Sequence, residues 1–212
     1  MRLMTRQRGA AVYRGTNSDH TLLKTAALPG IFLFNRDTVY LLTMKYLAIT
    51  GRQPAIALAE LESLFSARAI HPLPGGAALI DTENENLFYR LGSVIKVSKI
   101  LTTLETTDWF AIEKYLISAC KKNEQYVPDG KLTIGLSVYG IDVSPKMLER
   151  TALNIKKAVK STGRPVRIVP NKTREISTPQ IIHNDLTGPN GWELVLYRDG
   201  RKTILAQTVF IQ

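Results

Sequence analysis

KLTIGLSVYGIDVSPKMLERTALNIKKAVKS, residues 131–161, places a strand pattern directly before a helix pattern. Leucine, isoleucine and valine occupy every second position over Leu132–Val138, which predicts a strand with one buried face. Ser144 and Pro145 are typical of a helix N-cap and first helical position. Apolar residues then recur every three or four positions as far as Val159, so we expect an amphipathic helix packed against the strand.

The part of the chain before this stretch predicts a complete small domain. Residues 44–104 show strand, helix, strand, strand, helix and strand patterns in turn, which is the β-α-β-β-α-β order of a ferredoxin-like domain. The expected elements are 46–49, 54–65, 67–71, 77–80, 81–92 and 94–104.

A second domain is expected over residues 105–212, which gives the chain an α+β fold class overall. Besides the strand and helix quoted above, the expected elements are a helix at 109–123, a strand at 164–169, a short helix at 176–184 and a hairpin of 192–197 with 203–210. The hairpin turn is expected at Arg198-Asp199-Gly200.

Residues 1–43 differ from the rest of the chain. They show no sustained periodicity, and four arginines precede the first acid, Asp19. We expect an unstructured or mis-called extension, with Met44 as the true start. A mitochondrial transit peptide is the alternative, because such peptides are basic and poor in acids.

Cysteine content and hydropathy limit the class of protein. Cys120 is the only cysteine, so neither an intrachain disulfide nor a cysteine zinc cluster can form. We expect a buried structural thiol, a reducing compartment such as the cytoplasm, and no metal. No apolar run approaches the ~20 residues that span a bilayer, so no membrane partner is expected.

The positive charge is concentrated in residues 143–174. This segment holds nine basic residues and one acid, so 9 − 1 gives +8 of the net +10 of the whole chain. A local excess in a folded region is typical of a polyanion site, and RNA or DNA is the usual polyanion.

The arrangement of these charges separates two interpretations. On the expected helix, four cations share the face opposite the apolar stripe. A solvated helix face is the plain interpretation, but this face has one sign of charge and the excess continues into the next strand and loop. We therefore expect it to bind an anion or a nucleic acid. The four cations are Lys146, Arg150, Lys157 and Lys160.

Hydrogen-bonding residues follow the basic helix. A short helix that begins near Ser177 would direct free N–H groups at an anion, and nearby amides could contact sugars or bases. The plain alternative is that Ser177 and Thr178 only cap this helix. The full set of expected RNA-binding residues is Lys146, Arg150, Lys157, Lys160, Arg164, Arg167, Lys172, Arg174, Ser177, Thr178, Gln180 and Asn184.

The sequence contains no catalytic motif that we recognise. It lacks a glycine-rich nucleotide loop, an Asp-Pro-Pro-Tyr run, and the hydrolase and Walker patterns. We therefore expect a binding unit with no catalytic residue and no cofactor of its own.

Four blocks resemble a known family. They are similar to the THUMP-containing tRNA guanine-N2 methyltransferases of the guanine-10 class, in the right order and over residues 44–212. The blocks are YLAITGRQP (46–54) with LAELESL (58–64), LTIGLSVYG (132–140), ISTPQIIHN (176–184) and LAQTVFIQ (205–212).

The resemblance implies a fold, a partner and an incomplete enzyme. It implies a ferredoxin-like domain at 44–104 and an α/β THUMP domain at 105–212, which together grip the tRNA acceptor stem and 3′ CCA end. The family's Rossmann-like domain, which binds S-adenosylmethionine, would be missing, so the chain would be a truncated portion of the enzyme. The alternatives are a stand-alone THUMP RNA-binding adaptor that works with a separate catalytic subunit, or a ferredoxin-like ligand- or partner-binding module.

Overall fold

The computed structural model describes residues 45–212, so the expectations for residues 1–43 lie outside the described part. Its strands and helices are β1 (Lys45–Thr50), α1 (Pro54–Phe65), β2 (Ile70–Leu73), β3 (Ala77–Asp81), β4 (Val94–Leu104), α2 (Trp109–Asn123), β5 (Leu132–Tyr139), α3 (Pro145–Lys160), β6 (Val166–Ile168), α4 (Thr178–His183), β7 (Gly191–Asp199) and β8 (Lys202–Ile211). Short 3-10 turns are η1 (Ala67–Ala69), η2 (Glu85–Arg90) and η3 (Glu124–Tyr126).

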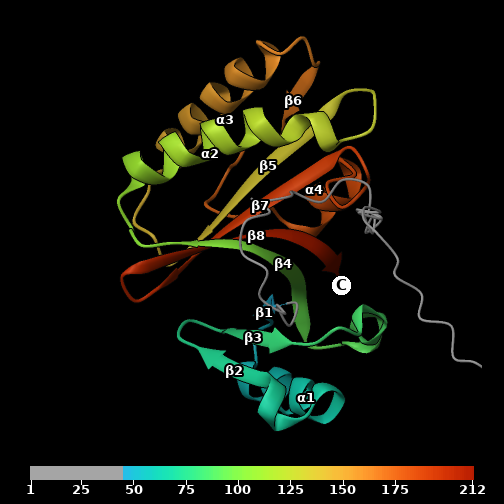
Figure 1. Cartoon of the computed structure of the whole chain (residues 1–212). Coiled ribbons are helices and arrows are strands. Elements are labelled where there is room, and N and C mark those ends of the chain that lie inside the picture. Colours follow the sequence, from blue (N-terminus) through green and yellow to red (C-terminus); the bar gives the residue numbers. More distant parts are fainter. Residues whose placement is uncertain (1–44) are drawn as a thin grey trace, which may run out of the picture.

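The strands form one mixed sheet in the order β2-β3-β1-β4-β8-β7-β5-β6 (Figure 1). β5 runs parallel to β7 and β6, and the other neighbours are antiparallel. β4, with 11 residues, pairs with β1 on one edge and with β8 on the other. The two expected domains therefore share a continuous hydrogen-bonded sheet.

This sheet corrects the expected fold class. A ferredoxin-like domain followed by a THUMP domain was expected, whereas the structure is one eight-stranded mixed sheet with helices. The second helix of the expected first domain is also absent, because residues 85–90 form the 3-10 turn η2. Asn84 and Asn86 flank its start, and asparagine side chains favour turns over helices. The division of the chain at residue 104 stays a prediction.

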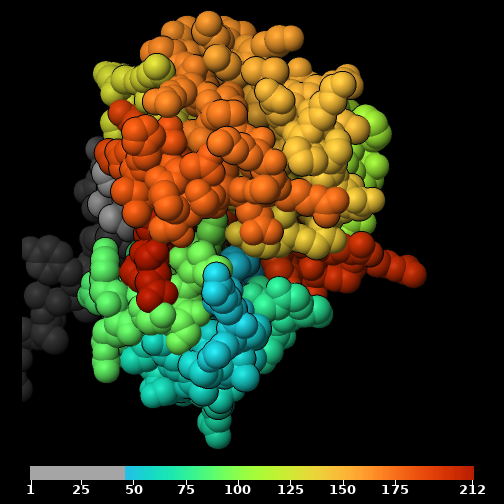
Figure 2. Space-filling view, turned by 180° about the vertical axis from the view of Figure 1, so that it is seen from behind, coloured from blue at the N-terminus to red at the C-terminus, as the bar shows by residue number. Residues whose placement is uncertain are grey.

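The sheet bends so that its two halves pack against each other. Leu47 and Ile49 of β1 share a buried cluster with Val195 and Tyr197 of β7, although β4 and β8 separate these strands in the sheet. The Tyr197 hydroxyl also donates to the carbonyl of Pro74, in the turn between β2 and β3. Figure 2 shows the gold-to-orange C-terminal half resting on the blue-to-green N-terminal half.

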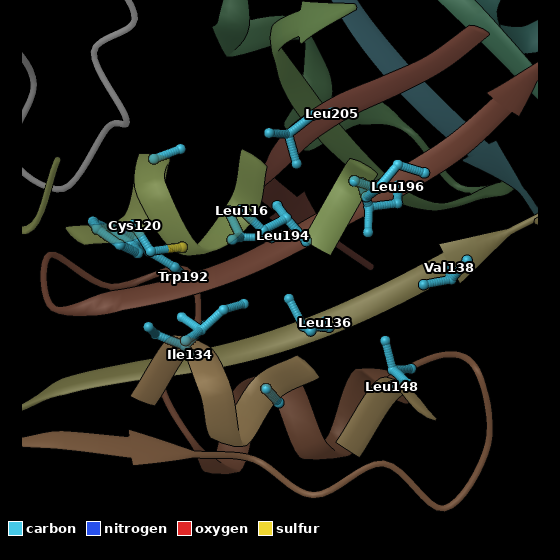
Figure 3. Packing of buried hydrophobic residues seen from close by; sticks show 14 of the residues in the cluster. Leu116, Cys120, Ile134, Leu136, Val138, Leu148, Trp192, Leu194, Leu196 and Leu205 are labelled. Atoms are coloured by element: carbon cyan, nitrogen blue, oxygen red, sulfur yellow. The ribbon is translucent and has the colours of Figure 1, made fainter. Parts of the chain in front are cut away.

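Helices cover the outer faces of both halves. α1 buries Ala57 and Leu61 against β1 and β3, and α2 and α3 cover β5, β7 and β8 (Figure 1). Figure 3 shows the larger core between α2 and α3 on one side and the strands on the other. Its labelled members are Leu116, Cys120, Ile134, Leu136, Val138, Leu148, Trp192, Leu194, Leu196 and Leu205.

The strand and helix quoted at the outset are confirmed. Leu132, Ile134, Leu136 and Val138 are at most 1% exposed. Ser144 caps α3 by accepting a hydrogen bond from the Met147 amide at 3.2 Å. The alternating apolar residues and the Ser144 cap are local sequence signals. The apolar residues of β5 lie on the face of the sheet that α3 covers.

Candidate nucleic-acid interface

The outer face of α3 carries four exposed cations. Leu148, Ala152, Ile155 and Val159 are buried against the sheet. The opposite face presents Lys146, Arg150, Lys157 and Lys160 to solvent. Within residues 45–212, none of these four forms an ion pair. The face therefore keeps its positive charge uncompensated, as the sequence predicted.

Helix α2 brings further cations beside α3. The Trp109 indole donates to the Thr151 hydroxyl at 3.1 Å, and the Asn154 amide donates to Glu113 at 2.8 Å, so the helices run side by side in the same direction. Their C-terminal ends are consequently adjacent. The last turn of α2 holds exposed lysines that the sequence-based prediction missed, although the adjacent pair was visible as a signal. They are Lys121 and Lys122.

The expected RNA-binding residues do not share one face of the sheet. A Cβ on Gly135 of β5 would lie 2.3 Å from Ile176 and 2.8 Å from Leu186. Because side chains alternate along a strand, these residues pack on the face opposite α3. Arg167 lies between Val166 and Ile168, whose side chains join the α3-side core, so it also points to the α4 side. The cations of α3 and the residues around α4 thus form two separate surfaces.

Arg164 faces inward. Its side chain is 11% exposed and bonds to Glu124, which is 13% exposed, at 2.6 Å. The same guanidinium donates to the carbonyls of Val127, Pro128 and Gly130 at 2.8–3.2 Å. It clamps the loop between α2 and β5, which uses most of the donors that an RNA contact would need.

Arg174 is partly engaged. Its guanidinium donates to the carbonyl of Val143 at 2.8 Å and to Asp142 at 2.9 Å, while 46% of the side chain stays exposed.

Arg167 and Lys172 are exposed and make no ion pair within residues 45–212.

The polar residues around α4 stabilise that helix. Ser177 and Gln180 form a capping box, with the Ser177 amide donating to the Gln180 side chain at 3.2 Å. The side-chain amide of Asn184 donates to the Gln180 carbonyl at 2.8 Å, at the C-terminal end of the helix. The capping role of Ser177 is therefore present in the structure. Thr178 is partly exposed as the first residue of the helix.

A buried ion pair lies between the strands on the α4 side. Lys96 of β4 contacts Glu193 of β7 at 2.5 Å, and both side chains are at most 1% exposed. Glu193 also accepts hydrogen bonds from Ser137 of β5 at 2.5 Å and Thr208 of β8 at 2.6 Å. Burial, and then the negative charge of Glu193, raise the pKa of nearby Tyr139. The sequence signal was a lone acid within the apolar run of β7.

The described residues show few features of a chemical site. They contain no group of three or more histidine, cysteine or acidic side chains that could hold a metal ion. None of their helices has the length and apolar character needed to cross a membrane. A shallow pocket of about 340 Å³ is lined by Gly51, Arg52, Gln53, Ile56, Gly92, Ser93, Ile95 and Gln212.

Comparisons with known proteins give structural similarity only. No family model and no curated protein matches the chain. TrmN from Thermus thermophilus is 12% identical, with a TM-score of 0.47, over 79% of this chain and 46% of TrmN. A 4-thiouridine synthetase in complex with RNA and ATP is 11% identical, with a TM-score of 0.44, over 79% of this chain and 41% of the synthetase.

A third structure is SMU.472, described as a candidate methyltransferase in complex with SAH. It is 13% identical, with a TM-score of 0.42, over 78% of this chain and 41% of SMU.472. The chain thus spans less than half the length of each of these three proteins. At these TM-scores the similarities identify no catalytic residue or cofactor contact in this chain.

These findings correct the identity drawn from the sequence. The chain was expected to be the RNA-binding portion of a guanine-10 tRNA guanine-N2 methyltransferase, truncated before its catalytic domain. No family model supports that class, and the similar structures include proteins described as methyltransferases or methylases. The expected truncation is therefore withdrawn. The expectation that this chain has no cofactor, which rested on the absence of recognised motifs, is withdrawn as well, since one similar structure holds SAH.

Proposed function

We propose that this chain binds RNA, with the exposed cations of α3 in contact with the phosphate backbone. The observation that carries the proposal is the row of Lys146, Arg150, Lys157 and Lys160 on one face, unpaired within residues 45–212. Like charges on one helix face repel each other, and bound phosphates relieve that repulsion.

Within RNA, we propose tRNA contacted at its acceptor stem and 3′ CCA end. The α3 side offers cations to a duplex backbone, which needs no base-specific groups. The α4 side combines Arg167 and Lys172 with the partly exposed Thr178 and Asn184, which suits unpaired nucleotides. An acceptor end presents a duplex and a single strand next to each other, so it can use both surfaces.

The proposed biological setting is RNA modification, and methylation in particular. The names of the similar structures support this setting, because they include methyltransferases and a 4-thiouridine synthetase bound to RNA. In cells that lack the gene, mass spectrometry of digested tRNA should show the loss of one methylated nucleoside. An unchanged nucleoside profile would contradict methylation as the setting and leave the binding proposal standing.

The binding proposal is tested by tRNA titrations across a salt series. Replacing Lys157 and Lys160 by glutamine should weaken binding and reduce the slope of log affinity against log salt by about 0.7–0.9 for each phosphate that is no longer neutralised. The matched control replaces Arg68 and Arg90, two exposed cations of the N-terminal half, by glutamine. Equal losses of affinity in both double variants would assign the effect to net charge alone.

The acceptor-end proposal has its own comparison. Wild-type protein should bind tRNA more tightly than tRNA without its CCA end, and that in turn more tightly than a random RNA duplex. Equal affinity for the last two, together with no effect of CCA removal, would exclude the acceptor end while RNA binding stands.

A further inference from the structure

The buried polar network links four consecutive strands of the sheet, β4, β8, β7 and β5, to one residue outside it. Lys96 and Glu193 form its centre, and Ser137 and Thr208 bond to Glu193. On the side of α4, two members converge on Ile176: Lys96 donates to the Ile176 carbonyl at 3.4 Å, and the Ile176 amide donates to the Ser137 hydroxyl at 3.0 Å.

Burying the Lys96–Glu193 pair costs free energy, so the hydrogen-bond partners of the pair indicate what it contributes to the fold. Desolvating two charges opposes folding, and an apolar pair of similar volume is often as stable. Here both charges have more than one hydrogen-bond partner: Glu193 accepts three hydrogen bonds, and Lys96 donates to Glu193 and to the Ile176 carbonyl. What the pair adds over an apolar core is directional bonding to the backbone of Ile176.

The segment that Ile176 belongs to is held by hydrogen bonds to the rest of the fold rather than by secondary structure of its own, including those of Arg174 to Val143 and Asp142 and of the Val169 amide to the Ile134 carbonyl. Residues 169–177 contain no helix or strand, and they run along the edge of β5 that the short β6 leaves open. Asn171 donates to the Leu136 carbonyl at 2.7 Å, and the Val138 amide donates to the Arg174 carbonyl at 2.9 Å. Lys172 is part of this segment, and α4 follows it.

We infer that the Lys96–Glu193 pair is a positioning device for the RNA-contacting segment 167–184. Lys96 lies 80 residues before Ile176 and is 1% exposed, so it cannot itself reach RNA. It acts through Ile176, whose 2% exposed side chain fills the space above Gly135. The inference rests on the proposed function, because it concerns the placement of the α4-side residues that would bind RNA.

The test replaces both charges together, as Lys96→Met with Glu193→Gln, which leaves no unpaired charge in the core. RNA affinity per folded molecule should fall, and the salt slope should fall by about 0.7–0.9 for each phosphate that the loosened segment no longer reaches. A variant that was only less stable would keep the wild-type slope. The slope thus reports the placement of the cations rather than the amount of folded protein.

Thr208→Val is the matched control. It removes one hydrogen bond to Glu193 in the same network and leaves both hydrogen bonds to Ile176 in place. It should keep the wild-type salt slope. An unchanged slope in the double variant, or an equal change in the Thr208→Val variant, would overturn the inference.

Hydrogen exchange separates this inference from the proposed function. The Ile176 amide should exchange about tenfold faster in the double variant than in Thr208→Val. If wild-type protein binds no RNA, the proposed function fails and the exchange result alone decides whether the pair holds the segment. Equal exchange rates of the Ile176 amide in both variants would overturn the inference that the Lys96–Glu193 pair holds the segment. Should the double variant not fold, Lys96→Met with Glu193→Met, which replaces both charges by apolar side chains of similar volume, takes its place.

Discussion

Replacing Arg164 should lower the stability of the protein and leave the RNA affinity of the folded protein unchanged. The guanidinium makes four hydrogen bonds, one to Glu124 at 2.6 Å and three to loop carbonyls. Only 11% of the side chain is exposed, so few donors are left for a phosphate. The sequence pattern placed Arg164 among the RNA contacts. The prediction therefore tests whether Arg164 instead stabilises the loop between α2 and β5.

The magnitude follows from the burial of the pair. Breaking a fully buried ion pair costs about 3–5 kcal/mol, because the remaining charge is unpaired. Glu124 is 13% exposed, so Arg164→Ala should cost about 3 kcal/mol, at the lower end of that range. Arg164→Lys keeps the charge and loses the fork geometry, so we expect about 1–2 kcal/mol. In a domain of this size each kcal/mol lowers Tm by about 2–4 °C.

Arg167 provides the matched comparison from the neighbouring strand. It is exposed and has no ion pair within residues 45–212, so Arg167→Ala should change stability by less than about 0.5 kcal/mol and weaken RNA binding. Urea unfolding and RNA titration of the Arg164 and Arg167 variants give the full comparison. Unchanged stability with weaker RNA binding in Arg164→Ala would refute the reasoning.

Three further predictions concern other parts of the fold. If α2 extends the α3 surface, replacing Lys121 and Lys122 by glutamine should weaken RNA binding and reduce its salt dependence in a salt-series titration. An unchanged slope of log affinity against log salt would confine the site to α3. Gly135→Ala should cost about 1–3 kcal/mol in urea unfolding, because the new methyl group would lie 2.3 Å from Ile176; unaltered stability would mean that this packing is loose. Burial raises the pKa of the Cys120 thiol above its ordinary value of 9.0, so the folded protein holds this proton more tightly than the unfolded chain does. The resulting contribution to the free energy of unfolding is present below pH ~9 and is lost as the pH rises further. In urea unfolding between about pH 8 and 10, Cys120→Ala should therefore show a smaller decline of the free energy of unfolding than the wild type.

Local patterns in the sequence predicted most of the secondary structure. The Ser144 cap begins α3 where expected, and its side chain accepts the expected backbone hydrogen bond. The hairpin was also expected, although Asp199 pairs with Lys202 and moves the turn to Gly200-Arg201. Such features depend on residues within one or two turns of each other, so the sequence contains all the information they need.

The joining of the two halves could not be predicted in this way. Nothing in the sequence of β4 indicates which strands will pair with its two edges. In an isolated domain, one of these edges would be exposed to solvent. In the structure β8 occupies that edge over most of its length. The sequence patterns did not predict the pairing of β4 with β8 because strand pairing is a tertiary contact, here between residues about a hundred positions apart.

The sequence by itself determined most of the elements, the buried stripe of α3 and the location of the +8 charge excess in residues 143–174. Only the tertiary structure decided how those charges are used. It turned Arg164 inward, set the cations of α3 and those near α4 on opposite sides of the sheet, and buried Lys96 against Glu193, 97 residues away. The physical reason is that a charge count is a property of composition, whereas the solvation and partners of each charge depend on which distant segments pack around it.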